Sequence, residues 1–559
     1  MENNLATKFI FVSGGVISGV GKGVATSSIA LLLKSRGFKV TAIKADPYLN
    51  IDAGTLNPVE HGEVFVLDDG MECDQDLGNY ERFLDSDLNS TNYMTSGQIF
   101  KSIIDKERAL GFGGKTVEFF QDPPKEVINR IIDCAKSNKA EIVLFEIGGT
   151  VGEYQNLLFL EANRLLKLQF PSDVLHVHVT YLPIPDSVGE MKSKPAQMSI
   201  NGLASFGIHA DIVLARSSRS VDEKRKEKIA LSSGIAKEDI ISAPDINNIY
   251  QAPINLENQR LSDKILGKLN ILPRRKDLMS WKRMVDKATL ARGEVNIAMV
   301  GKYFATGDFT LSDAYLSVIE AIKHAANYQG VRAKFSWIDS SQIERQGTNT
   351  LRNYDGIVVP GGFGSRSVEG IIDSITFARE NEIPYFGLCF GMQLATVEFA
   401  RNVVGLKKAH TTEIDKKTPY PVIDVMPEQE KLLVGEDYGG TMRLGSFPCK
   451  VRKGTIASKT YGKDTIYERH RHRYEFNNKY KSRLEKNGLV ISGTSPDGKL
   501  VEMIELARHP FFVGTQFHPE FKSRPLKPHP LYKKFIEVVV GRSRFEEIKE
   551  LSKSIVGGV

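Results

Sequence analysis

Short apolar runs alternate with amphipathic helical patterns over the first half of the chain. The first run, residues 9–12, leads through a glycine-rich turn into residues 26–36, where Ile29, Leu32 and Leu33 recur at helical spacing. Further apolar runs of strand length, each bounded by polar or helix-like sequence, lie at residues 40–43, 142–145, 174–179 and 212–214. This alternation is typical of a mostly parallel sheet covered by helices, so it predicts an α/β domain.

The pattern changes after residue 271. A basic Leu-Pro-Arg-Arg-Lys stretch and a charged helical pattern follow, with no strand signal until Val295. A second strand-helix series then begins, with apolar runs at residues 296–300, 357–359, 385–388 and 511–515. We therefore expect an α/β fold of two three-layer parallel-sheet domains. The expected boundaries are 1–272 for the first domain, 273–294 for a linker, 295–550 for the second domain and 551–559 for a loosely held tail.

Composition narrows the class of protein. The 559 residues are enough for two large domains, and 41% hydrophobic with 25% charged residues is close to the average of globular chains, which argues against disorder and coiled coil. The net charge of +6 is too dilute for nucleic acid to be the main partner, although clustered basic residues can still hold phosphates. We expect no nucleic-acid partner.

Cysteine usage and the amino terminus indicate a cellular compartment. The four cysteines, Cys73, Cys134, Cys389 and Cys449, lie far apart without a C-x-x-C pair, which excludes a disulfide framework and fits a reducing cytosol. The polar residues 1–8 run directly into an apparent strand, and no apolar run approaches the length of a membrane span. We expect a cytoplasmic protein without a membrane partner.

The first turn has features of a phosphate-binding loop. Residues 13–23 follow a strand and precede a helix, so backbone N–H groups can surround an anion while Lys22 reaches terminal phosphates. The match to G-x-x-x-x-G-K-[ST] is imperfect, because Val16 stands at the first glycine position and Gly23 takes the Ser/Thr position that contacts magnesium. Another metal ligand is then needed; a tight glycine turn without a ligand is the alternative.

Two carboxylates are candidate magnesium ligands. Glu146 stands at the carboxyl end of the apolar run 142–145, the edge of a parallel sheet where such ligands gather. Asp76 lies in a polar segment, and by spacing alone a solvated loop acid is at least as good an interpretation.

A second chemical centre is predicted near residue 389. Cys389 lies between Gly387 and Gly391 where a strand turns into a helix, a geometry that lifts a nucleophile out of the sheet and offers the N–H of Phe390 to an oxyanion. A buried packing cysteine is the alternative. His518 and Glu520 argue against it, because residues two apart in an extended segment share a face and can serve as base and orienting acid.

The glycine-rich loop 360–364 also follows an apparent strand and offers further N–H donors. Cys389, His518 and Glu520 are therefore predicted to form a catalytic triad.

These strings together resemble the CTP synthase family over nearly the whole chain. The first half is similar to its synthetase domain at residues 21–23 (GKG), 44–48 (KADPY), 61–66 (HGEVFV), 76–83 (DLGNYERF), 146–152 (EIGGTVG) and 192–197 (KSKPAQ). The second half resembles a class I glutaminase at residues 360–364 (PGGFG), 387–393 (GLCFGMQ), 469–474 (RHRHRY) and 516–520 (QFHPE).

The resemblance implies nucleotide sites in the first half. An ATP site is implied at Gly19, Val20, Gly21, Lys22, Gly23, Val24, Lys44, Asp76, Pro244, Asp245 and Ile246, with Mg²⁺ on Asp76 and Glu146. A UTP or CTP site is implied at Ser18, Lys192, Ser193, Lys194, Pro195, Ala196, Gln197 and Lys228, and a CTP-inhibitor pocket at Glu153, Tyr154 and Gln155.

It also implies glutamine contacts at Gly362, Phe390, Gly391, Met392, Gln393, Glu413 and Arg473, and an ammonia passage at His61 and Val64. GTP activation, CTP inhibition and a homotetramer that can form filaments are implied as family properties. The chain departs from the family pattern at Ser367, where glycine is expected after Arg366 in the region associated with GTP, and at residues 153–155.

The predicted activity is ATP-dependent amination of UTP to CTP with ammonia from glutamine. Two alternatives remain: another P-loop amidoligase fused to a glutaminase, acting on a carboxylate, and a nucleotide-sensing assembly protein with a vestigial thiol site. The basic stretch 468–473 can also be interpreted as a nucleic-acid or metal patch, although it lacks interleaved aromatic residues.

Overall fold

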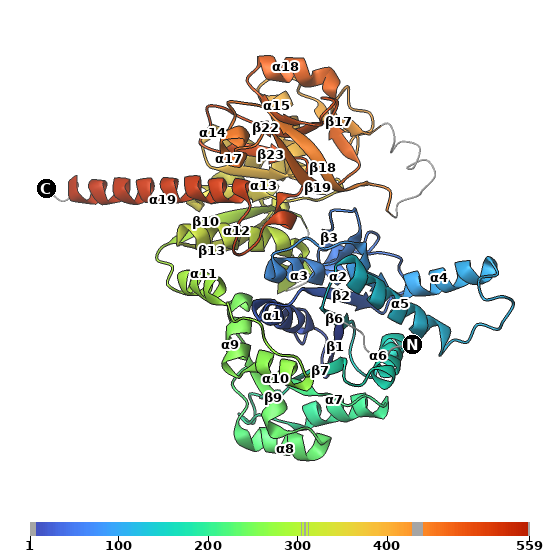
Figure 1. Cartoon of the computed structure of the whole chain (residues 1–559). Helices are drawn as coiled ribbons and strands as arrows, with labels where there is room; N and C mark the ends of the chain where they lie inside the picture. The colour runs from blue at the N-terminus through green and yellow to red at the C-terminus, as the bar shows by residue number, and fades with distance from the viewer. Residues whose placement is uncertain (1–6, 303–304, 307–308, 311, 427–439, 557–559) are drawn as a thin grey trace. The chain divides into compact units, whose positions relative to one another are not determined.

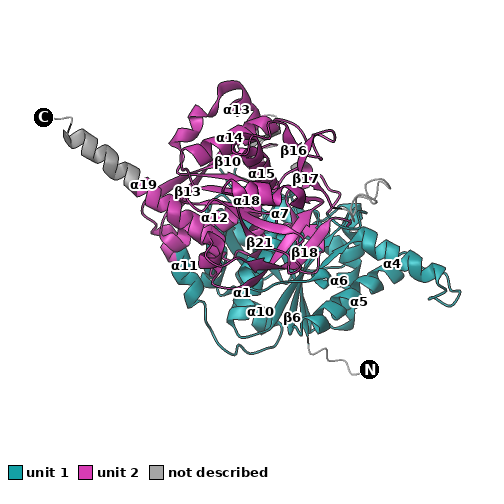
Figure 2. Cartoon of the chain, turned by 90° about the horizontal axis from the view of Figure 1, so that it is seen from above, with its two compact units in different colours: residues 1–53, 76–285 teal, residues 54–75, 286–559 magenta. Residues whose placement is uncertain are grey.

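The computed structural model describes residues 7–302, 305–306, 309–310, 312–426 and 440–556. The chain divides into two compact units, which Figure 2 shows in two colours. Unit 1 comprises the residues up to 53 and residues 76–285, and unit 2 comprises residues 54–75 and those from 286 onward. Residues 54–75, which the sequence pattern places in the first domain, thus group with the second half of the chain.

Unit 1 is built on a seven-stranded sheet whose neighbouring strands are all parallel (Figure 1). The strand order is β5 (Tyr93–Thr95), β2 (Val40–Asp46), β6 (Ile142–Ile147), β1 (Lys8–Gly14), β7 (Val174–Tyr181), β8 (Ile212–Ser217) and β9 (Ile240–Pro244). The apolar runs predicted as strands in this half all lie in this sheet, which confirms the α/β prediction.

Helices cover both faces of this sheet because successive strand residues point to opposite sides. Phe9 and Phe11 of β1 join one buried cluster with residues of α5 and α6, whereas α1 contacts β1, β2 and β6. The helices are α1 (Lys22–Ser35), α3 (Asp76–Leu84), α4 (Ser96–Arg108), α5 (Asp122–Ser137), α6 (Leu157–Gln169), α7 (Lys194–Ser205), α8 (Glu223–Ser233), α9 (Ala252–Asn258) and α10 (Leu261–Lys268).

Helix α11 (Met279–Thr289) lies within the segment expected to be a linker. Its Trp281 is buried against Phe83 and Tyr250 and donates through Nε1 to the Tyr250 carbonyl at 2.8 Å. The beginning of this segment is therefore anchored in unit 1.

Unit 2 contains a nine-stranded sheet that is parallel over five neighbouring strands and antiparallel beyond them. The parallel part is β13 (Arg332–Asp339), β10 (Glu294–Gly301), β14 (Gly356–Val359), β15 (Tyr385–Leu388) and β23 (Phe512–Thr515). The antiparallel extension is β22 (Val501–Glu505), β21 (Val490–Thr494), β18 (Arg443–Val451) and β19 (Thr465–His472).

Two buried clusters on opposite faces of this sheet make unit 2 a three-layer fold. One face packs against α13 (Ser340–Gln346), α14 (Val368–Glu380) and α15 (Phe390–Asn402), and the other against α12 (Leu316–Gln329) and α19 (Pro530–Val556). Helix α19 continues to Val556 through most of the expected tail, of which residues 557–559 lie outside the described residues.

Smaller elements complete unit 2. They are α2 (Pro58–His61), the hairpin of β3 (Val64–Val66) and β4 (Glu72–Asp74), β11 (Ala305–Thr306) with β12 (Phe309–Thr310), β16 (Ala409–Thr411), β17 (Tyr420–Val425), α17 (Ile456–Tyr461), β20 (Tyr474–Phe476) and α18 (Lys481–Lys486).

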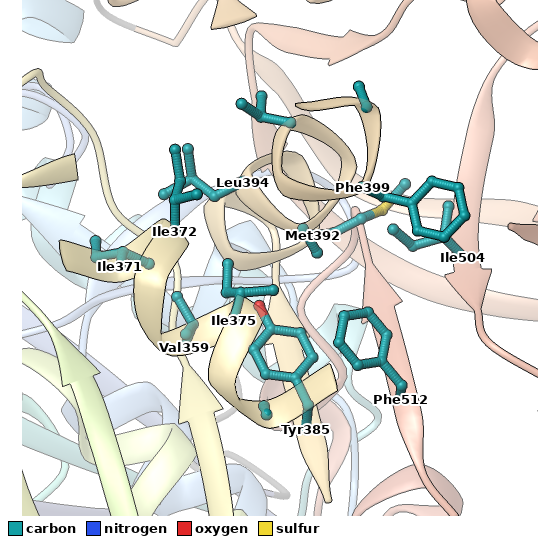
Figure 3. Packing of buried hydrophobic residues seen from close by; sticks show 14 of the residues in the cluster. Val359, Ile371, Ile372, Ile375, Tyr385, Met392, Leu394, Phe399, Ile504 and Phe512 are labelled. Atoms are coloured by element: carbon teal, nitrogen blue, oxygen red, sulfur yellow. The ribbon is translucent and has the colours of Figure 1, made fainter. Parts of the chain in front are cut away.

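A buried hydrophobic cluster next to the β15–α15 turn fixes the position of the start of α15. Figure 3 shows Tyr385 beside Phe512 and Ile375, in a buried cluster that also contains Ile371, Ile372 and Met392. The Tyr385 ring stacks on Phe512 at a centroid distance of 4.6 Å, and its hydroxyl donates to the Gly391 carbonyl at 2.9 Å. Because a buried tyrosine hydroxyl is costly without a partner, this bond ties the first turn of the helix to the strand.

Candidate functional site

The loop between β1 and α1 has the backbone of an anion-binding turn. Gly19 and Gly21 have φ of +68° and +88°, the left-handed region that glycine adopts without a Cβ penalty. The amino end of α1 follows directly, and Lys22 donates from Nζ to the Gly149 carbonyl at 2.7 Å. Burial lowers the pKa of Lys22, although the charge of Glu146 opposes that shift. The loop thus offers N–H groups and a cation to a phosphate.

Gly23 makes room for a carboxylate at the start of α1. A Cβ at position 23 would lie 1.9 Å from Oδ1 of Asp76 and 2.7 Å from its Cγ. The residue that replaces the usual Ser/Thr of the motif therefore allows Asp76, the first residue of α3, to approach the loop. The structure brings together two residues that the sequence could relate only through resemblance.

This packing predicts that Gly23 cannot be replaced by a larger residue without a loss of stability. Gly23→Ala is expected to lower the melting temperature of the protein by about 2–10 °C, because overpacking a tight site costs about 1–3 kcal/mol. Gly267→Ala in α10 is the matched control, since its Cβ would meet nothing within 4 Å and alanine favours a helix. Thermal melts of both variants measure the difference; equal melting temperatures would contradict the proposed packing.

Lys44 lies among three carboxylates at the carboxyl ends of β2 and β6. Its ammonium donates to Asp76 and lies 3.4 Å from Oε1 of Glu146 and 3.7 Å from Oδ1 of Asp46. Tyr80 donates its hydroxyl to Glu146. Burial raises the pKa of Glu146 and of Asp46, and Lys44 opposes both shifts. Glu146 and Asp46 therefore depend on nearby cations to stay ionised.

The donor set suits magnesium better than a transition metal. No group of three or more His, Cys, Asp or Glu side chains arranged for a metal occurs in the described part of the chain. Magnesium needs only one or two carboxylates when phosphates and water complete its shell, and Asp76 and Glu146 converge on the same lysine nitrogen. These two carboxylates fit such an ion.

An apolar cavity of about 120 Å³ adjoins the loop. The predicted residues Gly21, Val24, Pro244 and Ile246 line it, together with Leu214. Its size and mostly apolar lining suit a planar ring.

Arg216 also lines this cavity and is a residue that sequence reasoning missed. It donates to the Val20 carbonyl at 3.2 Å and pairs with Asp245 at 2.5 Å. The sequence feature that could have indicated Arg216 is its position at the carboxyl end of the apolar run in β8.

Most of the residues predicted for pyrimidine nucleotides, residues 192–197, lie at the start of α7. Helix α7 begins at Lys194, Gln197 donates to the Ser193 hydroxyl at 3.0 Å, and Lys192 pairs with Glu190 at 2.9 Å. Pro195 and Ala196 lie in the first turn of α7, Lys228 lies in α8, and Ser18 is exposed in the phosphate loop.

The predicted inhibitor triplet follows β6. Glu153 accepts from the Thr150 N–H at 3.0 Å and from the Gln155 side chain at 2.9 Å, and these bonds hold its pKa below the usual value against the effect of burial. Tyr154 is 91% exposed. The triplet is therefore ordered by its own polar contacts while its aromatic ring faces solvent.

In unit 2, Cys389 occupies a strained elbow between β15 and α15. Its φ of +48° and ψ of −97° are unusual for a residue other than glycine. Gly391 allows the helix to approach the sheet, because a Cβ there would lie 2.3 Å from the Val359 carbonyl. The thiol lies 3.5 Å from the amide nitrogen of Gln516 and 3.8 Å from the Arg471 carbonyl. This geometry is that of a nucleophile elbow.

His518 and Glu520 lie beside the elbow. Nδ1 of His518 lies 2.7 Å from Oε1 of Glu520, and a Cβ on Gly361 would lie 2.9 Å from Cε1 of His518 and 3.8 Å from Cβ of Cys389. Burial alone would lower the pKa of His518, but Glu520 and Cys389 raise it to about 10. A basic imidazole next to a thiol can accept its proton.

This pKa predicts a pH-dependent contribution to stability. Because the folded value of about 10 exceeds the ordinary 6.5, the contribution is complete below about pH 6.5 and is lost as pH rises through about 10. Glu520→Gln removes the partner charge. The melting-temperature difference between wild type and this variant is therefore expected to be largest near pH 6.5 and to shrink toward pH 10. A constant difference across thermal melts at these pH values would contradict the pairing.

The loop 360–364 and its neighbours complete the thiol site. Gly362 faces the Phe390 ring, since a Cβ on this glycine would lie 3.7 Å from the ring carbon Cδ1, and the Gly364 N–H donates to Glu413 at 2.8 Å. Gln393 donates to the Tyr474 carbonyl at 2.9 Å. The predicted glutamine residues Gly362, Phe390, Gly391, Met392, Gln393 and Glu413 thus lie within this loop, the first turn of α15 and their contacts, and Arg473 lies between β19 and β20.

Ser367 adopts a backbone conformation that glycine would adopt more readily. Its φ is +49°, in the left-handed region, at the residue before α14. Serine in place of the expected glycine therefore adopts a left-handed backbone conformation that costs a residue with a Cβ about 1–2 kcal/mol.

The segment 54–75 is fastened to unit 2 by ion pairs. Asp68 pairs with the fully buried Arg469 and with Lys522, and these cations hold its pKa below the usual value although burial opposes them. Glu72 accepts from Arg471 at 2.8 Å. The predicted passage residues belong to this segment: His61 ends α2 and is exposed, and Val64 begins β3 and is buried.

The basic stretch 468–473 is largely an interior structure. Besides Arg469, both His470 and His472 are buried, and burial lowers the pKa of each, that of His472 to about 3. Neutral buried imidazoles and paired arginines do not form an exposed basic surface, so the nucleic-acid interpretation of this stretch loses its support.

Comparisons with known proteins identify the family of both parts of the chain. Residues 8–271 match the family described as CTP synthase N-terminus, and residues 310–538 match glutamine amidotransferase class-I. The chain is 48% identical over 535 residues to a protein named CTP synthase from Halalkalibacterium halodurans, covering 95% of this chain and 99% of the relative. It is 51% identical over 532 residues to a protein of the same name from Carboxydothermus hydrogenoformans, covering 95% and 98%.

Among solved structures, the glutaminase domain of Trypanosoma brucei CTPS with bound acivicin is 37% identical and covers 44% of this chain and 94% of its own, with a TM-score of 0.41. None of the helices in the described ranges combines the length and apolarity that crossing a membrane requires.

Proposed function

Because this chain belongs to the CTP synthase family, whose activity is amination of UTP to CTP with glutamine, we propose that Cys389, His518 and Glu520 release the ammonia and that the phosphate loop of unit 1 activates UTP. The observation that carries the proposal is the elbow of Cys389, with the paired His518 and Glu520 beside it.

The thiol site supports hydrolysis of a carboxamide. The Cys389 sulfur attacks the amide carbon of glutamine after His518 takes the thiol proton. The N–H of Phe390 and an N–H from within the loop 360–364 stabilise the oxyanion. His518 then protonates the departing nitrogen, so ammonia leaves, and water releases glutamate from the thioester. Glu520 orients the imidazole and stabilises its charged form.

The phosphate loop supports activation of the pyrimidine. Oxygen O4 of UTP is a poor leaving group, so transfer of the terminal phosphoryl group of ATP to O4 would release ADP and give a phosphate ester. Ammonia then attacks C4, and the C4–O4 bond breaks with release of inorganic phosphate. Lys22 and Lys44 would contact the transferring group and spread its charge. Asp76 and Glu146 would hold Mg²⁺, which supplies further charge neutralisation when bound. The cavity lined by Val24, Leu214 and Ile246 suits the adenine of ATP.

The remaining sites are proposed on the family's pattern. UTP, or CTP as product, would contact residues 192–197 and Lys228, while CTP as inhibitor would contact residues 153–155. His61 and Val64 would border the path of ammonia, which must stay unprotonated to remain a nucleophile. GTP activation, assembly into tetramers and filaments, and a cytoplasmic location complete the proposal.

Release of ADP that depends on UTP tests the proposed function. Purified protein with ATP, Mg²⁺ and glutamine is expected to form ADP, glutamate and CTP in equal amounts only when UTP is present. ADP release that requires a carboxylate acceptor instead of UTP would favour the other amidoligase reaction, and no nucleotide turnover with any acceptor would favour a sensor.

A further inference from the structure

Lys302 is a buried cation beside the thiol site that the reaction scheme above does not use. It follows the last residue of β10, and only 6% of its surface is exposed. Desolvation lowers its pKa to about 8, and the charges of Glu413 and Glu344 oppose this shift. Burying an ammonium group is costly, so its contacts indicate what it holds in place.

The first contact fixes the loop 360–364. The Lys302 ammonium donates to the Gly364 carbonyl, while the Gly364 N–H donates to Glu413 at 2.8 Å. Gly364 has φ of +84°. Because glycine adopts many backbone conformations at similar cost, this residue does not by itself fix the path of the loop. A cation on one side of this residue and a carboxylate on the other therefore determine where the loop ends.

The second contact fixes the start of α15. Nζ of Lys302 lies 4.7 Å from the centroid of the Phe390 ring, within the range of a cation–π interaction. The same ring faces Gly362, at which a Cβ would lie 3.7 Å from ring carbon Cδ1. One ammonium group thus contacts both segments from which the proposed mechanism takes its oxyanion donors, the loop through the Gly364 carbonyl and α15 through the Phe390 ring.

We propose that Lys302 is a positioning residue for the oxyanion hole, holding the loop 360–364 against the first turn of α15. This inference rests on the proposed function of the thiol site. An oxyanion hole requires its donors at about 2.7–3.1 Å from the developing charge, so a small displacement of one segment relative to the other weakens catalysis while glutamine still binds.

Lys302→Met tests this assignment. The kcat of glutamine hydrolysis is expected to fall about 10- to 100-fold with little change in KM, because one oxyanion donor is worth about 10²–10³ in rate and a displaced donor loses part of that. Alkylation of Cys389 by iodoacetamide, followed on its peptide by mass spectrometry, should keep its wild-type rate, since displacement of iodide by sulfur forms no oxyanion. Ammonia-supported CTP formation should also be unchanged.

Two further variants make the result decisive. Lys302→Arg keeps the charge and the donor and is expected to restore most of the kcat, and Lys453→Met, an exposed lysine after β18, is the control that should change nothing. If the Met variant does not fold, Lys302→Gln takes its place. In the folded variant, an unchanged ratio of glutamine kcat to Cys389 alkylation rate overturns the proposal. Failure of the proposed function itself would appear separately, as wild-type protein that releases no ammonia from glutamine.

Discussion

Replacing Cys389 by alanine is expected to lower glutamine-supported CTP formation by about 10⁴-fold or more, because loss of the nucleophile of a catalytic triad removes the covalent route entirely. Ammonia-supported formation should remain at its wild-type rate, since UTP activation is assigned to Lys22, Lys44 and their carboxylate neighbours in unit 1. CTP formation with glutamine and with ammonium chloride, measured side by side, gives both rates.

Cys449→Ala is the matched control for this variant. Cys449 is also a buried thiol of unit 2, but burial raises its pKa and keeps it protonated. Both activities should survive its replacement. Equal loss of the two activities in Cys389→Ala would contradict the division of chemistry between the thiol site and the phosphate loop.

Replacing Lys22 by methionine is expected to produce the opposite pattern. CTP formation should fall by about 10²–10³ with either nitrogen source, because the variant lacks a cation that stabilises the charge of the transferring phosphoryl group. The hydrolysis of glutamine, measured as glutamate release, should persist because the thiol site contains no part of the loop.

Lys39→Met, an exposed lysine before β2, is the control and should leave both reactions unchanged. A Lys22→Met protein that still forms CTP from ammonia at the wild-type rate would remove the phosphate loop from the reaction.

Local patterns were sufficient for much of the fold and for the thiol site. The apolar runs at residues 9–12 and 385–388 became buried central strands because a parallel sheet covered on both faces requires continuous apolar sequence. The flanking glycines predicted the elbow of Cys389 for a steric reason that the structure bears out, since Gly391 has no room for a Cβ.

Features that depend on distant residues could not be predicted in the same way. The grouping of residues 54–75 with unit 2 rests on pairs such as Asp68 with Arg469, which lie 401 residues apart in the sequence. In the antiparallel extension of the second sheet, strands β18 and β21 have mixed burial, which gives a weak periodic signal.

Single residues without a motif were also missed. Arg216 is the last residue but one of β8 and Lys302 follows β10, and only the fold shows which backbone groups they reach. Asp76 could be predicted only in part. Its spacing in the sequence fits a solvated acid, whereas in the structure its carboxylate accepts from Lys44 and lies against Gly23.

The origin of the nitrogen in CTP tests the central claim most directly. The protein is incubated with UTP, ATP, Mg²⁺, glutamine labelled with ¹⁵N at the amide and a large excess of unlabelled ammonium at a pH where little of it is free ammonia. Mass spectrometry should find the label in the exocyclic nitrogen of CTP, and Cys389→Ala should give only unlabelled CTP. Wild-type CTP whose label merely equals that of the ammonium pool would contradict delivery of the glutamine nitrogen from Cys389 to the activated pyrimidine.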